Sequence, residues 1–131
     1  MEFLLATAPL LLVSLFLCIT FVFSIGEKLL DWKGTVTFYT HHFKGTFIAK
    51  IIPISLIIVL LLEFLTVVLF FIGLYELFTL SHYTFLLLAL TSCAITLLVL
   101  LIGQRFAKDY PGAMSLGVYF VITILGLIVI P

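Results

Sequence analysis

The stretch from Ile51 to Leu74 reads IIPISLIIVLLLEFLTVVLFFIGL and contains a single charged residue, Glu63. A helix needs about 20 apolar residues to cross the hydrocarbon core of a bilayer. The apolar residues form a continuous run and do not alternate with polar ones, so a helix is expected and not a barrel strand. The stretch therefore predicts a membrane-spanning helix with one carboxyl group near its middle.

Three further apolar runs of this kind flank the stretch. We interpret the first as a retained helix and not as a cleaved signal peptide. It is longer than the apolar region of such peptides, and no Lys or Arg precedes it. The sequence thus predicts an all-α integral membrane four-helix bundle, a single transmembrane domain over residues 1–131. The expected spans are about 3–25, 51–74, 83–103 and 113–130.

The overall composition agrees with a membrane protein. The chain has 131 residues, of which 65% are hydrophobic and 9% charged, and its formal net charge is zero. Soluble domains have about 45–50% apolar and about 25% charged residues. These values exclude a soluble globular enzyme, a disordered tail and a disulfide-rich secreted module. They predict a lipid bilayer as the main partner, and the neutral charge argues against nucleic acid.

The basic residues predict the orientation of the bundle. They are confined to the connections between the first and second spans and between the third and fourth: Lys28, Lys33, Lys44, Lys50, Arg105 and Lys108. Because cytoplasmic loops carry an excess of Lys and Arg, both connections are expected in the cytoplasm. The chain is therefore predicted to be a multi-pass protein of a bacterial cytoplasmic (inner) membrane, with both termini in the periplasm.

The connection over residues 26–50 is predicted to contain an amphipathic helix. Its apolar residues recur every three or four positions, which makes one helix face of Trp32, Val36, Tyr39, Phe43 and Phe47. His42 is expected to lie away from this face. The segment, with Trp32, Tyr39, Phe43 and Phe47, is either an interfacial anchor or a lid or floor for a site between the helices. In the second case Gly34 and Gly45 would be its flexible ends.

Glu63 is the main candidate for chemistry. A charge at the centre of a span costs about 2.5–3.5 kcal/mol even on insertion scales. Glu63 should therefore face the bundle and either find a partner or keep its proton. Thr66 lies one turn away, and Ser55 lies on the same broad face. Glu63 is interpreted as a proton-relay, quinone-binding or substrate-binding carboxyl, or as an interhelical hydrogen-bond clamp.

A second polar cluster lies at the end of the first span, where Ser24, Gly26, Glu27 and Lys28 follow one another closely. On charge alone this cluster is a solvated helix end, where ion pairs on the surface contribute little to the stability of the protein. Glu63 is about 18 Å along its helix from Ile51. A direct ion pair between Lys28 and Glu63 is therefore not expected unless the region around Gly26 enters the bundle.

The remaining motifs carry little chemistry. Cys18 and Cys93 are isolated in different spans and are expected to be packing residues. No metal site is predicted. Pro111 and Gly112 are expected to break the chain before the last span. The spacing of Ala113 and Gly117 permits close contact, within the bundle or in a homo-oligomer.

The run FSIGEKL from Phe23 to Leu29 resembles the G-x-K-L signature of DoxX-like membrane proteins. In that family a Pro precedes the second span, and the second span carries a Glu and then a Gly near its end. Pro53, Glu63 and Gly73 match these positions. The four-span architecture of the family covers nearly the whole chain.

The resemblance implies a small subunit of, or an accessory to, a membrane redox complex that communicates with the quinone pool. The family includes the membrane subunit of thiosulfate:quinone oxidoreductase. Quinone is thus the candidate cofactor and other redox subunits are candidate partners, while catalytic residues stay unassigned. The candidate intramembrane site consists of Ser24, Gly26, Glu27, Lys28, Glu63 and Thr66. The alternatives are a small proton-coupled transporter that uses Glu63 and a purely structural or assembly subunit.

Overall fold

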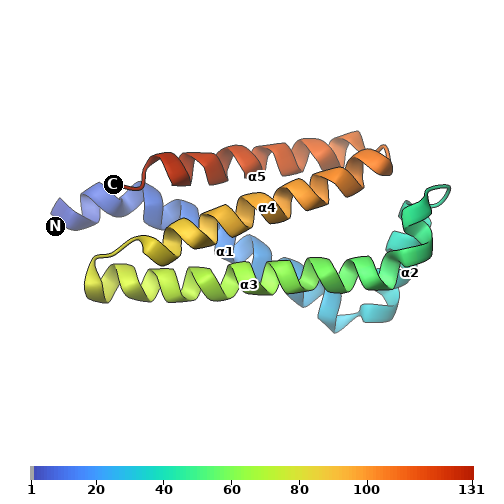
Figure 1. Ribbon diagram of the computed structural model, residues 1–131, viewed down its shortest axis with the longest axis horizontal. Helices are drawn as coiled ribbons and strands as arrows, with labels where there is room; N and C mark the ends of the chain where they lie inside the picture. The colour runs from blue at the N-terminus through green and yellow to red at the C-terminus, as the bar shows by residue number, and fades with distance from the viewer. Residues whose placement is uncertain (1) are drawn as a thin grey trace.

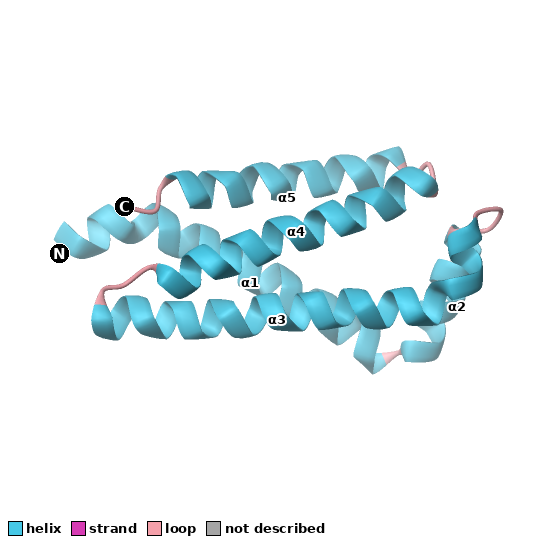
Figure 2. Ribbon diagram, viewed as in Figure 1, coloured by secondary structure: helices cyan, strands magenta, loops and turns pink. Residues whose placement is uncertain are grey.

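The computed structural model describes residues 2–131, and this part of the chain is almost wholly helical (Figure 1, Figure 2). The elements are α1 (Glu2–Leu30), α2 (Trp32–His42), a 3-10 helix η1 (Phe47–Ile51), α3 (Ile52–Leu80), α4 (Thr84–Phe106) and α5 (Tyr110–Ile128). The helices α1, α3, α4 and α5 are long and apolar enough to cross a membrane. The predicted all-α bundle with a short segment between its first two spans is confirmed, and the chain is a multi-pass membrane protein.

The four long helices run up and down along one axis. Both termini lie at one end of the bundle, and α2 and the turn between α4 and α5 lie at the other, here called the α2 end (Figure 1). Every basic residue belongs to an element or turn at the α2 end: Lys28, Lys33, Lys44, Lys50, Arg105 and Lys108. The charge asymmetry expected from the sequence is thus an asymmetry of the folded molecule.

The core of the bundle is formed by buried apolar side chains of α1, α3 and α4, against which partly buried side chains of α5 pack. Its fully or nearly fully buried members include Leu10, Leu17, Phe21, Phe70, Leu86, Leu90, Cys93 and Leu97. The residues on the outward faces are also apolar, as a bilayer requires. Association of such helices depends on close packing, because lipid tails are as apolar as the side chains they would replace.

Two glycines allow this close packing. A Cβ atom on Gly73 would lie 2.8 Å from the backbone nitrogen of Leu86, so α3 and α4 touch there nearly backbone to backbone. A Cβ atom on Gly126 would lie 2.9 Å from a methyl carbon of Val13. Gly117, by contrast, is exposed and has open space beside it. The close contact of α5 within the chain is therefore made at Gly126 and not at the predicted position.

Helices α3 and α5 extend beyond their predicted spans. Helix α3 continues to Leu80, and the carboxylate of its Glu76 accepts a hydrogen bond of 3.1 Å from the backbone N–H of Phe85, which satisfies a free donor in the first turn of α4. Helix α5 begins at Tyr110, and the prediction that Pro111 and Gly112 break the chain before it is wrong. Pro111 lies in the first turn, where a missing N–H costs least.

Helix α2 is the predicted amphipathic helix. The Asp31 carboxylate caps its start by accepting a hydrogen bond of 3.1 Å from the Gly34 N–H. Gly34 therefore lies within the first turn and is not a flexible end, whereas Gly45, with a φ of 87°, forms the turn that follows. The inward face of α2 and its continuation consists of Trp32, Val36, Tyr39 and Phe43, which pack with Ile52 and Leu56.

Phe47 does not belong to this face. It begins η1, is exposed, and contacts the ring of Phe106 edge to face with the centroids 5.2 Å apart. The helical spacing that placed Phe47 on the face of α2 is interrupted by the turn at Gly45.

Candidate functional site

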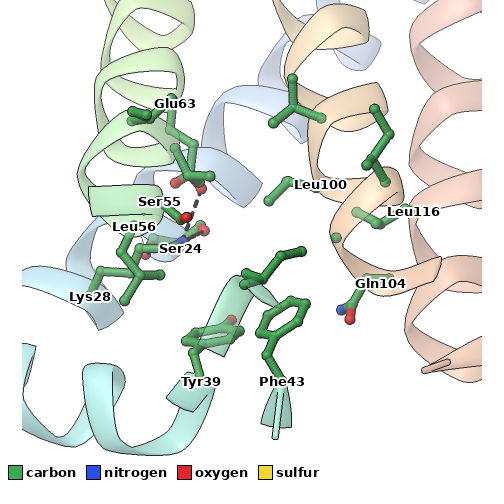
Figure 3. A pocket seen from close by; sticks show the side chains of 16 residues that line it. Ser24, Lys28, Tyr39, Phe43, Ser55, Leu56, Glu63, Leu100, Gln104 and Leu116 are labelled. Carbon is green, nitrogen blue, oxygen red and sulfur yellow. Dashed lines mark hydrogen bonds and ion pairs between the residues drawn. The ribbon is translucent and has the colours of Figure 1, made fainter. Parts of the chain in front are cut away.

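The polar centre of the molecule is an ion pair between α1 and α3. Lys28 Nζ donates a hydrogen bond of 2.9 Å to Glu63 Oε1 and another of 2.6 Å to Ser24 Oγ, one turn back along α1 (Figure 3). Glu63 is completely buried, and Lys28 is 8% exposed. Opposite charges in such surroundings stabilise each other strongly, because few water dipoles compete with them.

This ion pair was not expected unless the region around Gly26 entered the bundle, and the structure meets that condition. Helix α1 continues through Lys28 to Leu30, and α3 together with η1 extends well past the end of α1 (Figure 1). The end of α1 therefore lies beside the middle of the second span. Helix α2 packs beside the remaining part of α3.

A cavity of about 380 Å³ adjoins the ion pair, between α3, α4 and the inward face of α2 (Figure 3). Its walls are mainly aliphatic and aromatic. Its polar residues are Ser24, Lys28, Tyr39, Ser55, Glu63 and Gln104. A mostly apolar hollow with a few convergent polar groups is typical of a small-molecule site.

One oxygen atom of the site has no partner. Glu63 Oε2 is buried and makes no hydrogen bond with any described residue. Its carboxyl group lines the cavity, so this oxygen can accept a hydrogen bond from a ligand or, when protonated, donate one. A buried polar atom without a partner costs free energy, which a ligand with a matching polar atom would recover.

The cavity opens toward the lipid-facing surface. Ile58 on α3 and Ile102 on α4 line it, and each is about half exposed on the outside of the bundle. The cavity therefore reaches the apolar surface of the bundle near these two residues.

Tyr39 provides a hydroxyl group that stays protonated. Burial raises its pKa above the ordinary value, and the carboxylates of Glu63 and Glu27 raise it further. Tyr39 on α2 lines the cavity together with Phe43. Of the two interpretations of this segment, the arrangement favours a floor for a site between the helices.

The other predicted site residues lie near the ion pair without joining it. Thr66 is buried, but its hydroxyl donates to the Leu62 carbonyl at 2.9 Å and lies 2.7 Å from Ser92 Oγ. Glu27 is exposed and faces a separate polar pocket. Gly26 is absent from the lining of the cavity. The structure thus unites Ser24, Lys28 and Glu63 and leaves the other three at the margin.

A cluster at the rim of the cavity was missed by the sequence analysis. His42 Nε2 lies 3.0 Å from Gln104 Oε1 and 3.4 Å from Asp109 Oδ2, which joins the end of α2 to the turn between α4 and α5. The expectation that His42 lies away from the aromatic face is wrong, because its ring packs beside Tyr39 and Phe43. Its position three residues after Tyr39 was the available signal.

Substituting Asp109 tests this junction. We expect Asp109→Ala to lower the free energy of unfolding by about 1 kcal/mol, because Asp109 also caps α5 through a 2.9 Å hydrogen bond from the Gly112 N–H. Asp109→Asn is the control, since it keeps a capping oxygen and removes the charge beside His42. Thermal unfolding in detergent measures both variants. Equal losses in the two would show that the cap contributes nothing.

The described residues hold no candidate metal centre. Among residues 2–131, no group of three or more His, Cys, Asp or Glu side chains is placed to hold a metal ion. No family model, curated protein or solved structure matches the chain. The function is therefore argued from the site itself.

Proposed function

We propose that the chain is a DoxX-like membrane protein that binds a quinone in the cavity beside Lys28 and Glu63. In this proposal it serves as a small subunit of, or an accessory to, a membrane redox complex. The observation that carries the proposal is a buried ion pair at the polar end of an otherwise apolar cavity that opens toward the lipid. The motif residues Gly26, Lys28, Pro53, Glu63 and Gly73 supply the family resemblance.

The chemistry of the lining suits a quinone. The ring carbonyls need hydrogen-bond donors. The protonated hydroxyl of Tyr39 can supply one, and Lys28 can supply another in place of its long 3.4 Å hydrogen bond to the Ser24 carbonyl. The rings of Tyr39 and Phe43 can stack on a flat ligand ring. The apolar tail would follow the aliphatic walls and leave between Ile58 and Ile102. A bound quinone would supply two-electron redox chemistry.

The orientation follows from the basic residues at the α2 end. We propose that this end faces the cytoplasm of a bacterium and that both termini face the periplasm. The quinone site would then lie in the cytoplasmic half of the membrane. A redox partner that donates or accepts electrons would dock at the same end. Purification of the intact chain in mild detergent, with mass spectrometry of what copurifies, identifies such a partner.

Quinone binding can be measured with the chain's own fluorophore. Trp32 is the single tryptophan and packs against the cluster of Phe43, Ile52 and Leu56, of which Phe43 and Leu56 line the cavity. We expect a benzoquinone with a ten-carbon tail to quench its fluorescence saturably in lipid nanodiscs. The double variant Lys28→Met/Glu63→Leu should raise the dissociation constant of the quinone about tenfold or more, which is a loss of about 1.4 kcal/mol in binding free energy.

A matched control separates binding from charge. Lys44→Met/Glu2→Gln also removes one base and one acid, but both residues are exposed and neither lines the cavity. This variant should bind as the natural sequence does. Quenching that never saturates, or equal affinity in both double variants, would overturn the proposal.

A proton-coupled transporter is the second candidate, and the buried Glu63 with an unpartnered oxygen favours it. Proteoliposomes loaded with a pH-sensitive dye distinguish the two. A proton flux abolished by Glu63→Gln, without saturable quinone quenching, would establish the transporter. If Glu63→Gln left both quinone binding and proton flux as they are and changed only the stability of the chain, the result would indicate a structural subunit.

A further inference from the structure

A second hollow approaches the ion pair from the other side. It is a pocket of about 320 Å³ at the elbow between α1 and α2, here called the polar pocket. Its lining includes the exposed carboxylates of Glu27 and Asp31, and also Thr35. Carboxylates at such a position stay hydrated, so the polar pocket is an aqueous space at the α2 end of the molecule.

The cavity and the polar pocket share three residues. Ser24, Lys28 and Tyr39 line both of them. Lys28 therefore stands between an apolar cavity that faces lipid and a polar pocket that faces water. Its ammonium group is already hydrogen-bonded to Glu63 on one side and to Ser24 within α1.

We propose that the polar pocket is the route by which protons reach Glu63 from water, with Lys28 as the carrier. The Lys28 ammonium passes a proton along its hydrogen bond to Glu63 Oε1, so that an N–H bond breaks and an O–H bond forms. The resulting amine takes a proton from hydronium in the polar pocket. The net change is one proton moved from water to the Glu63 carboxyl. Rotation of this carboxyl group then turns the new O–H from Lys28 toward the cavity, where it can donate its proton to a ligand.

The surroundings of Lys28 favour this transfer. The carboxylates of Glu27 and Asp31 attract protons to the mouth of the pocket. The remaining titratable side chain that lines the two spaces is Tyr39, which burial keeps protonated. Helix α4 contributes the uncharged Gln104.

Cysteine labelling tests the route without any ligand. Ser24→Cys, in a background of Cys18→Ala/Cys93→Ala, places a thiol between the two spaces. We expect a small cationic thiosulfonate that does not cross membranes to label it. Thr35→Trp, within the polar pocket, should slow labelling about tenfold by limiting access.

The matched control is Thr37→Trp. Thr37 lies on the same helix, donates its hydroxyl to a backbone carbonyl four residues back as Thr35 does, and lines neither space. It should leave the labelling rate unchanged. Failure of the reagent to label Ser24→Cys, or equal rates with both tryptophans, would overturn the route. Thr35→Leu gives a milder block if Thr35→Trp does not fold.

The use of this route to protonate a ligand rests on the proposed quinone binding, and Lys28→Arg tests it. Arginine keeps the charge opposite Glu63 but does not release a proton in proteins. An electrode supplies electrons to the protein–quinone complex in a lipid film, with quinone at a saturating concentration so that a change in its affinity does not enter the comparison. Under these conditions the proton-coupled reduction of quinone bound to Lys28→Arg should be about a hundredfold slower than in the natural sequence.

The outcomes of the two experiments are distinguishable. An unchanged reduction rate in Lys28→Arg refutes the carrier role while quinone binding stands. Absence of any bound-quinone signal in the natural sequence refutes the proposed function, and the labelling experiment still decides whether water reaches Lys28.

Discussion

Replacing Lys28 with methionine is expected to lower the free energy of unfolding by about 3–5 kcal/mol. The reason is the position of its partner. Glu63 is completely buried, and its Oε1 accepts the Lys28 hydrogen bond while its Oε2 has no partner among the described residues. Lys28→Met would leave a carboxylate without a counter-charge in an apolar environment. Titration with SDS in mixed micelles, followed by Trp32 fluorescence and circular dichroism, measures the loss.

Two further variants show whether the loss comes from the pair. Lys33→Met removes an exposed lysine a few residues away and should change stability by less than about 0.5 kcal/mol. Lys28→Met/Glu63→Leu removes both charges and should recover most of the loss, because an apolar pair of similar volume packs well in place of a buried ion pair. If the double variant were as unstable as Lys28→Met, the unpaired carboxylate would not be the cause.

The spans of the bundle could be predicted because their signal is local. Long continuous apolar runs have few alternatives in a chain of this length, and each predicted span lies on one of the four long helices. The helix ends were less predictable. Helix α1 extends to Leu30, and Lys28 in its last turn pairs with Glu63. This partner lies on another helix, so the local sequence does not reveal it.

The individual members of the site were visible in the sequence, but their arrangement was not. A carboxyl group within an apolar run identified Glu63, and the G-x-K-L run identified Lys28. Whether they meet depends on how far α1 reaches along α3, and hydrophobic periodicity does not contain the register between two helices. A distance counted from the start of the second span placed the two charges too far apart.

The cluster at the rim of the cavity could not be predicted from the sequence for the same reason. His42, Gln104 and Asp109 come from segments far apart in the sequence, and none forms a recognised motif with the others. Their meeting depends on the turn after α4, which brings Asp109 beside the end of α2. Tertiary structure was needed to find this cluster, whereas the capping role of Asp31 follows from its place directly before α2.

The contact between α3 and α4 leads to the second large expected effect. We expect Gly73→Leu to lower the free energy of unfolding by about 3 kcal/mol. A Cβ atom at this position would lie 2.8 Å from the backbone nitrogen of Leu86 and 2.9 Å from a methyl carbon of the same residue. A flexible side chain could move aside, but the backbone of α4 cannot do so without separating the two helices.

Gly117→Leu is the matched control, because it makes the same change in α5 where no atom lies within 4 Å of the added Cβ. Leucine is a better helix former than glycine by about 1 kcal/mol, so this variant should be unchanged or slightly more stable. The same SDS titration measures both variants. If Gly73→Leu were as stable as Gly117→Leu, the close approach of α3 and α4 would not limit the packing of the bundle. If Gly117→Leu were instead strongly destabilised, the open face of α5 would have to contact a neighbouring molecule. The homo-oligomer that the spacing of Ala113 and Gly117 permits would then gain its first support.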